Sequence, residues 1–173
     1  MMQTWIILGA TSSMARAFAR KVAASGACVL LAGRDMADLK AMAEDCRLRG
    51  ARAAEALAFD ARDPSGFPAL IDRMEREEGA LNAAVFVGSM PAQAEIDADP
   101  SLIDGVVTDS HTGPARFLQM LAPLIEARGQ GTVVGVCSVA GDRGRIGNYV
   151  YGSAKAGFAT YLSGLRHRLP RGG

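Results

Sequence analysis

Short runs of apolar residues alternate along the chain with longer segments in which apolar residues recur at helical spacing. This alternation is typical of βαβ units and a parallel sheet. The expected strands cover residues 5–8, 28–32, 53–59, 83–87 and 132–137, and the expected helices cover residues 13–25, 36–48, 63–79, 101–127 and 149–169. The pattern therefore predicts an α/β protein with a Rossmann-type, doubly wound parallel sheet of about five strands in three α/β/α layers.

The sequence also predicts the character of the segments that connect these elements. A polar, proline-containing loop is expected over residues 90–100, and a glycine-rich loop over residues 141–147. We expect the long helix to be interrupted near Gly113 and Pro114, since proline lacks the N–H that helical hydrogen bonding requires. No internal repeat, low-complexity tract or linker divides the sequence, so residues 1–173 are expected to form a single domain.

Composition and charge restrict the classes of protein to be considered. The chain has 173 residues, of which 49% are hydrophobic, and this suits one domain with a sizeable core rather than a disordered or fibrous protein. Its formal net charge of +1 gives no reason to expect nucleic acid or an anionic membrane as a partner. The first apolar run is too short for a signal peptide or a spanning helix, so we expect a cytoplasmic protein.

The cysteines predict neither a disulfide framework nor a metal site. Cys28, Cys46 and Cys137 are odd in number and lack the CxxC spacing of a zinc site. We expect them to be buried, reduced thiols.

The most specific candidate site combines Tyr151 and Lys155 with Ser138. Residues four apart on a helix project from the same face, so the phenol and the ammonium are expected to meet. A tyrosine ionises near pH ~10, and a cation beside it favours the phenolate, which allows acid–base chemistry at neutral pH. Ser138 follows the fifth expected strand, and its hydroxyl could hold a carbonyl oxygen for the tyrosine to protonate. The alternative is a solvated Tyr/Lys pair without chemistry.

The turn after the first strand is a candidate site for the phosphates of a nucleotide. It runs Gly9-Ala-Thr-Ser-Ser-Met-Ala15 directly into a helix. Small residues let the backbone approach a pyrophosphate, whose charge is stabilised by the free N–H groups at the helix N-terminus. An ordinary turn between a strand and a helix also favours small residues, so this stretch alone leaves both interpretations open.

The ends of the second and third strands add two candidates for cofactor binding. Dinucleotide sites selective for NAD usually carry an acidic residue after the second strand, where this chain has Gly33 and Arg34. The guanidinium of Arg34 suits a 2′-phosphate, so we expect NADP(H) to be preferred over NAD(H). The alternative is a solvated arginine that Asp35 partly neutralises. Asp60 could accept a hydrogen bond from the adenine amino group, or it could simply cap the following turn.

Together these stretches resemble the short-chain dehydrogenase/reductase family over essentially the whole chain. The spacings from Ser138 to Tyr151 and from Tyr151 to Lys155 match the family's active site. The segment from Ser138 to Tyr151 is also similar to a subgroup that includes decaprenylphosphoryl-ribose keto-reductases. The resemblance implies one NAD(P)-binding Rossmann domain over residues 1–173, a small-molecule carbonyl or alcohol as substrate, and a homodimer or homotetramer paired through the last two long helices.

The resemblance also implies a role for each candidate residue. Tyr151 is the acid–base residue, Lys155 lowers the tyrosine pKa and binds the nicotinamide ribose, and Ser138 orients the substrate carbonyl. Asp60 takes the adenine-contacting position and Gly88 the glycine that closes the fourth strand. The residues on the glycine-rich cofactor turn are Gly9, Thr11, Ser12, Met14 and Ala15.

Several departures from the family pattern bear on activity. Ser13 and Ala15 replace two glycines of the cofactor turn, and Val85-Phe-Val-Gly88 replaces Asn-Asn-Ala-Gly. Ser110 aligns with the asparagine of the family's proton relay. Family members also continue with two further strands and a substrate-covering segment, so we expect a fragment or altered form of a longer enzyme, or a chain that a partner subunit completes. The sheet would then expose a strand edge.

Three functions remain as hypotheses from the sequence. The first is an NADP(H)-dependent oxidoreductase that interconverts a carbonyl and an alcohol by hydride transfer, with Tyr151 transferring the proton. The second is a catalytically impaired or non-catalytic nucleotide-binding protein, because of the missing C-terminal segment. The third is a scaffold that binds no nucleotide, and it requires the small-residue turn and Arg34 to be accidents.

Overall fold

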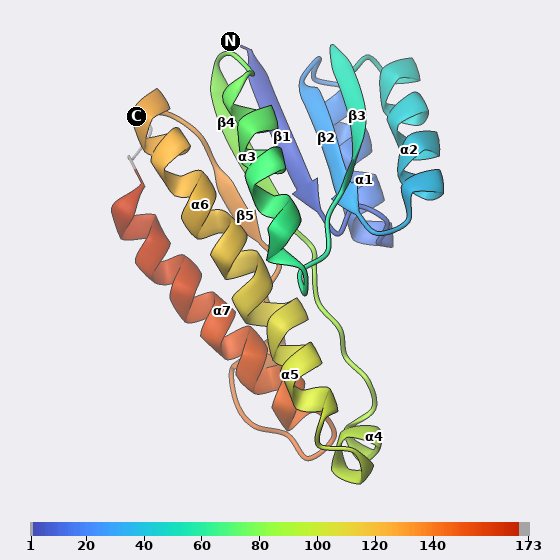
Figure 1. The fold of residues 1–173 in the computed structure, drawn as a ribbon, viewed down its shortest axis with the longest axis vertical. Coiled ribbons are helices and arrows are strands. Elements are labelled where there is room, and N and C mark those ends of the chain that lie inside the picture. The colour runs from blue at the N-terminus through green and yellow to red at the C-terminus, as the bar shows by residue number, and fades with distance from the viewer. Residues whose placement is uncertain (1, 170–173) are drawn as a thin grey trace.

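A five-stranded parallel sheet forms the centre of the chain (Figure 1). The structure is a computed structural model that describes residues 2–169. The strands are β1 (Gln3–Leu8), β2 (Cys28–Gly33), β3 (Ala53–Ala58), β4 (Ala80–Val85) and β5 (Val133–Gly135). They lie in the order β3-β2-β1-β4-β5, so the direction of winding reverses between β1 and β4. The predicted fold class and number of strands are confirmed.

Helices cover both faces of the sheet and bury two apolar clusters against it (Figure 1). One face carries α1 (Ser13–Ala23) and α2 (Met36–Leu48), and the other carries α3 (Phe67–Glu75), α6 (Gly113–Arg128) and α7 (Tyr149–Arg168). Successive strand residues point to opposite faces. Ile6 and Leu8 therefore join the cluster under α3, α6 and α7, whereas Ile7 joins the cluster under α1 and α2.

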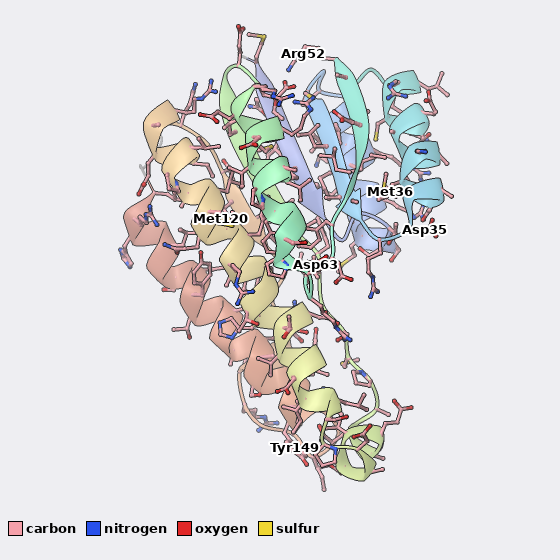
Figure 2. The ribbon with its side chains drawn as sticks, viewed as in Figure 1. Asp35, Met36, Arg52, Asp63, Met120 and Tyr149 are labelled. Atoms are coloured by element: carbon pink, nitrogen blue, oxygen red, sulfur yellow. The ribbon has the colours of Figure 1, made fainter. Side chains whose placement is uncertain are left out.

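Side-chain caps explain where the first two helices begin. The hydroxyl of Ser12 accepts a hydrogen bond from the Ala15 N–H at 3.2 Å, and the carboxylate of Asp35 accepts one from the Asp38 N–H at 3.1 Å. Figure 2 shows Asp35 at the start of α2. Each bond satisfies an N–H group that the first helical turn leaves free. The bounds predicted for α2 are confirmed, and α1 ends two residues earlier than predicted.

The connection between β4 and the long helical region differs from the prediction. A short helix, α4 (Gln93–Ala98), lies within the segment for which only a loop was expected. The long helix is divided into α5 (Leu102–Val107), a π-helical segment η2 (Thr108–Thr112) and α6. The interruption therefore lies immediately before Gly113. Pro114 directly follows this irregular turn, in which the Gly113 N–H donates to the Thr108 carbonyl five residues earlier.

The fourth and fifth strands also have bounds that the pattern did not predict. β4 begins at Ala80 rather than residue 83, because the polar Asn82 lies buried inside it with both ends of its amide bonded. Its nitrogen donates to the Thr4 carbonyl at 3.2 Å, and its oxygen accepts from the Thr132 N–H at 2.9 Å. β5 pairs with β4 over three residues only. The Val136 N–H donates to the Val85 carbonyl, and beyond Val136 the chain leaves the sheet.

Candidate active site

A cleft of about 320 Å³ lies at the carboxyl ends of the central strands, beside the point where the winding reverses. Rossmann-type sheets bind ligands in this position. Of the residues that the sequence assigned to the cofactor, those that line the cleft are Gly9, Thr11, Ser12, Arg34, Asp60 and Gly88. The structure therefore brings most of the predicted cofactor positions together. Met14, which is 60% exposed, does not line this cleft, and neither do Tyr151 and Lys155.

The turn after β1 approaches the exit of β4 closely at Gly9. This glycine has a φ of 74°, and a β-carbon there would lie 3.0 Å from the Val87 nitrogen. Its own N–H donates to the Ala32 carbonyl at 2.9 Å. The hydroxyl of Ser12 is used to cap α1, so backbone N–H groups are the donors that this turn offers to a ligand.

Arg34 and Asp60 face the same cleft from the ends of β2 and β3. Arg34 is exposed and makes no ion pair within residues 2–169. The neighbouring Asp35 caps α2 rather than neutralising the guanidinium. One oxygen of Asp60 accepts from the Arg62 N–H at 2.9 Å, so the turn-capping interpretation holds for that oxygen.

Lys155 reaches from α7 to the ends of β4 and β5. Its side chain is almost fully buried, and its ammonium donates to the carbonyl oxygens of Val87 at 3.1 Å and Val136 at 3.0 Å. Burial lowers the pKa of this lysine, and the nearby Cys137 thiol opposes that shift. The ammonium thus lies at the carboxyl edge of the sheet, where Val87 also lines the cleft.

Tyr151 lies one helical turn before this lysine on α7, and Ser138 lies in the loop after β5, which packs against α7. The loop packs tightly against α7, because Gly152 lies so close to Ala140 that a β-carbon on Gly152 would clash with the Ala140 carbonyl. The Ser138 hydroxyl accepts from the Ala140 N–H at 3.2 Å. The ring of Tyr151 packs on a small apolar cluster formed by Ile96, Val106 and Val150. In the part of the chain that the structure describes, no hydrogen bond joins the side chains of Ser138, Tyr151 and Lys155.

Ser110 lies beside this group. It is fully buried in η2, and its hydroxyl both donates to the Ser89 carbonyl and accepts from the Ser89 N–H, each at 3.3 Å. A β-carbon on Gly88 would lie 3.3 Å from the Lys155 nitrogen and 3.4 Å from the Ser110 oxygen. The absence of a side chain at Gly88 therefore lets Lys155 and Ser110 approach the same point.

Sequence reasoning missed an ion pair at the wall of the cleft. Arg62 binds Asp109 through two hydrogen bonds of 2.9 and 2.7 Å, and Asp109 is 8% exposed and lines the cleft. The hydrogen bonds to Asp109 raise the pKa of the Arg62 guanidinium. The sequence feature that could have indicated this pair is the acidic Asp109 near the predicted interruption of an apolar helix. This pair ties the loop after β3 to η2.

The cysteine prediction is wrong at one position. Cys28 and Cys46 are buried, and burial raises the pKa of both thiols, but Cys137 is exposed because it follows β5 at the open edge of the sheet. Within residues 2–169, no group of three His, Cys, Asp or Glu side chains is arranged to hold a metal ion. Over the same residues, no helix is both long and apolar enough to cross a membrane.

The chain is similar in sequence to known oxidoreductases. A sequence profile described as short chain dehydrogenase matches residues 3–173. The chain is 35% identical over 165 residues to an uncharacterized oxidoreductase of Mycobacterium tuberculosis, covering 95% of this chain and 66% of that protein. It is 32% identical over 165 residues to a sulfoacetaldehyde reductase of Chromohalobacter salexigens, covering 92% and 64%. The chain thus spans about two thirds of the length of the curated relatives it matches.

Solved structures share the same fold. A short-chain dehydrogenase from Sphingobium yanoikuyae in complex with NADPH superposes with a TM-score of 0.79 at 26% identity, covering 98% of this chain and 66% of that one. An alcohol dehydrogenase from Comamonas testosteroni that is specific for bulky-bulky ketones gives a TM-score of 0.84 at 22% identity, with 95% and 66% covered. At that identity the second likeness concerns the fold alone.

Proposed function

The chain belongs to the short-chain dehydrogenase family, and from this premise we propose that it interconverts a carbonyl and an alcohol with NADP(H). The observation that carries the proposal is the position of Lys155. Its buried ammonium lies at the carboxyl edge of the sheet, next to the cleft that Gly9, Arg34 and Gly88 line. A cation at that point can favour the ionised form of a tyrosine on the same helix face.

In the proposed reaction the protein moves one proton. When bound, NADP(H) would supply or accept the hydride at the carbon of the substrate. In the direction of reduction, Tyr151 donates its phenolic proton to the carbonyl oxygen as the C–H bond forms, and solvent returns that proton to the phenolate. Lys155 stabilises the phenolate by its charge, and Ser138 donates a hydrogen bond that orients the carbonyl.

The position of the cleft and the donors around it support a dinucleotide as the ligand. The lack of a side chain at Gly9 lets the turn pack closely on the exit of β4, and Gly9, Thr11 and Ser12 line the cleft beside the start of α1, where backbone N–H groups can bind phosphates. Arg34 is the cationic group that we propose for the 2′-phosphate of NADP(H), since no partner within residues 2–169 neutralises it. We propose the oxygen of Asp60 that does not cap the turn as the acceptor for the adenine amino group. The NADPH-bound relative supports this choice of cofactor.

We also propose that copies of the chain pair through α6 and α7. Figure 1 shows these two helices side by side along one face. Met120, labelled on α6 in Figure 2, is 36% exposed, and a groove between the helices is lined by Gln119, Tyr161 and Leu165. Sedimentation equilibrium tests this pairing: a dimer or tetramer is expected, and a monomer at micromolar concentration contradicts it.

The proposed chemistry is tested by replacing Tyr151 with phenylalanine. Tyr151→Phe removes the proton donor but keeps the ring, so NADPH affinity is expected to persist while turnover falls by about 10²-fold or more. The matched control is Tyr161→Phe, which removes a tyrosine hydroxyl from the same helix; that hydroxyl donates to Gln119. Carbonyl reduction is followed by NADPH absorbance. Unchanged turnover in Tyr151→Phe refutes the assignment.

A second candidate function is nucleotide binding without catalysis. The observation that favours it is the absence, within residues 2–169, of a hydrogen bond from Tyr151 to Lys155 or Ser138. In this case NADPH would bind, as measured by calorimetry, but the intact chain would reduce no member of an aldehyde and ketone panel. A chain that binds neither NADPH nor NADH contradicts both functions.

A further inference from the structure

A third apolar cluster lies apart from the two that support the sheet. It consists of Ile96 from α4, Val106 from α5 and Val150 from the first turn of α7, and the ring of Tyr151 packs against it. Figure 1 shows α4 at the far end of the molecule, beside the beginning of α7. The immediate surroundings of Tyr151 are therefore provided in part by a short helix in the connection after β4.

Gln93 joins this short helix to α7 at the position next to Tyr151. It is 5% exposed, and its amide oxygen accepts a hydrogen bond from the Val150 N–H at 3.3 Å. The N–H of Val150 belongs to the first turn of α7, where the helix itself offers no acceptor. Because Val150 is also buried, water is a poor substitute for Gln93, and the loss of this acceptor would leave a buried donor unpaired.

A second contact holds the same two segments on the solvent side. The amide nitrogen of Gln93 donates to Asp97 at 3.0 Å, and the hydroxyl of Tyr149 donates to the same carboxylate oxygen at 2.7 Å. The Tyr149 hydrogen bond, followed by the one from Gln93, lowers the pKa of Asp97. Figure 2 shows Tyr149 at this end of the molecule, near α4. Gln93 and Asp97 lie four residues apart and so share one face of α4.

We propose that Gln93 is a positioning residue for Tyr151, fixing the first turn of α7 against α4 so that the Tyr151 ring is held in one place on this apolar cluster. Asp97 and Tyr149 form the outer part of the same clamp. The role in turnover rests on the proposed function, because it takes Tyr151 as the proton donor. The role in placing the Tyr151 ring follows from the contacts of α4 and can be measured separately.

The test observes Tyr151 directly by fluorine NMR. The full chain contains three tyrosines, so labelling with 3-fluorotyrosine gives three resonances that single Tyr→Phe variants assign. Gln93→Leu removes the acceptor for Val150, and the Tyr151 resonance is expected to move by more than its linewidth. Gln93→Glu keeps an acceptor for the Val150 N–H but loses the donor to Asp97 and places a second carboxylate beside it, so the Tyr151 resonance is expected to lie between the Gln93→Leu and wild-type positions.

The matched control is Gln119→Leu, which removes a different glutamine that contacts α7 through the Tyr161 hydroxyl. It is expected to leave the Tyr151 resonance in place. If Gln93→Leu fails to fold, Tyr149→Phe breaks the exposed part of the clamp and is expected to shift the Tyr151 resonance by a smaller amount. An unmoved Tyr151 resonance in Gln93→Leu, or in Tyr149→Phe where that variant is the one measured, overturns the proposal. An equal shift in Gln119→Leu also overturns it.

Kinetics separate this inference from the proposed function. In an active chain, Gln93→Leu is expected to lower kcat by about tenfold or more, since a small displacement of a catalytic group is costly, while the Kd for NADPH stays unchanged. Full kcat in a folded Gln93→Leu chain overturns the positioning role. If the wild-type chain reduces no carbonyl while the Tyr151 resonance still responds to Gln93, the proposed function fails and the structural role of the clamp stands.

Discussion

The ammonium nitrogen of Lys155 lies 3.1 Å from the carbonyl oxygen of Val87, so a side chain on α7 is bound to the point where the chain leaves β4. Its second hydrogen bond, to Val136, joins the same ammonium to the end of β5. β5 pairs with β4 over only three residues. The proposed catalytic lysine therefore also links the ends of two neighbouring strands.

Replacing Lys155 tests whether the cost of burying its charge is balanced by the hydrogen bonds that its ammonium makes. Lys155→Met removes a buried charge and leaves two half-buried carbonyls to bind water, so at pH 7 the free energy of unfolding is expected to change by no more than about 1 kcal/mol. Turnover is expected to be lost. The matched control is Lys40→Met on the exposed side of α2, with both properties kept. A loss of stability well beyond that of the control contradicts this balance.

The same variant gives a pH dependence with a definite sign. Burial lowers the pKa of Lys155 in the folded chain, whereas the unfolded chain keeps a value near 10.5. Between these two values the unfolded chain binds more protons, so the stability of wild type relative to Lys155→Met is expected to rise with pH. Urea unfolding of both chains across the alkaline range measures this difference. A difference that falls with pH shows that the lysine is stabilised, not penalised, by its surroundings.

The apolar pattern along the chain predicts the strands and the layers well, because each apolar run by itself indicates which residues a strand or helix can bury against the sheet. α2 illustrates this, since Asp35 caps its start and its apolar residues recur at helical spacing. β4 shows the limit of such patterns. Asn82 interrupts the apolar run, and only its hydrogen bonds to residues far away in the sequence allow the strand to include it.

Some residues of the candidate site could likewise be predicted from the sequence, and others could not. Gly9, Arg34 and Gly88 follow strands, and their meeting at one edge of the sheet follows from the topology. The clamp at Gln93 could not be predicted, because the sequence pattern showed only a polar loop there and the acceptor role depends on how α4 docks on α7. The partnership of Arg62 with Asp109 likewise depends on tertiary packing across 47 positions.

Two glycines with similar positive φ angles allow a test of how closely the cofactor turn approaches β4. Gly9 has a φ of 74°, and a β-carbon there would lie 3.0 Å from the Val87 nitrogen. Gly26 has a φ of 78°, and a β-carbon there would meet no neighbouring atom within 4 Å. Gly26→Ala should cost about 1 kcal/mol for conformation alone. Gly9→Ala should cost about 1 kcal/mol more than that, because of the close contact, and should weaken NADPH binding. Equal losses in thermal unfolding contradict the close approach.

The proposed role of Arg34 is to make the cleft prefer NADP(H) over NAD(H). Arg34→Ala removes a charge-assisted contact to the 2′-phosphate, which is worth about 1.5–3 kcal/mol, so NADPH affinity is expected to fall by about 10- to 100-fold. NADH affinity is expected to stay unchanged, because NADH lacks that phosphate. Calorimetric titration of both cofactors measures the ratio, with Lys40→Ala as the control for the loss of one exposed cation nearby. An equal effect on both cofactors contradicts the assignment.

The ion pair between Arg62 and Asp109 is expected to stabilise the fold more than an exposed pair of the same geometry. The Asp109 side chain is 11% exposed, although that of Arg62 is 52% exposed, and the guanidinium lies directly against Gly105, where a β-carbon would be 2.7 Å from its terminal nitrogen. A double-mutant cycle of Arg62→Ala and Asp109→Ala is expected to give a coupling energy of about 1–3 kcal/mol. Arg168 and Glu126 form a comparable two-bond pair in which both side chains are about one third exposed, and their coupling is expected to be about 0.2–1 kcal/mol. Coupling no larger at Arg62 than at Arg168 would show that burial of Asp109 does not strengthen the pair.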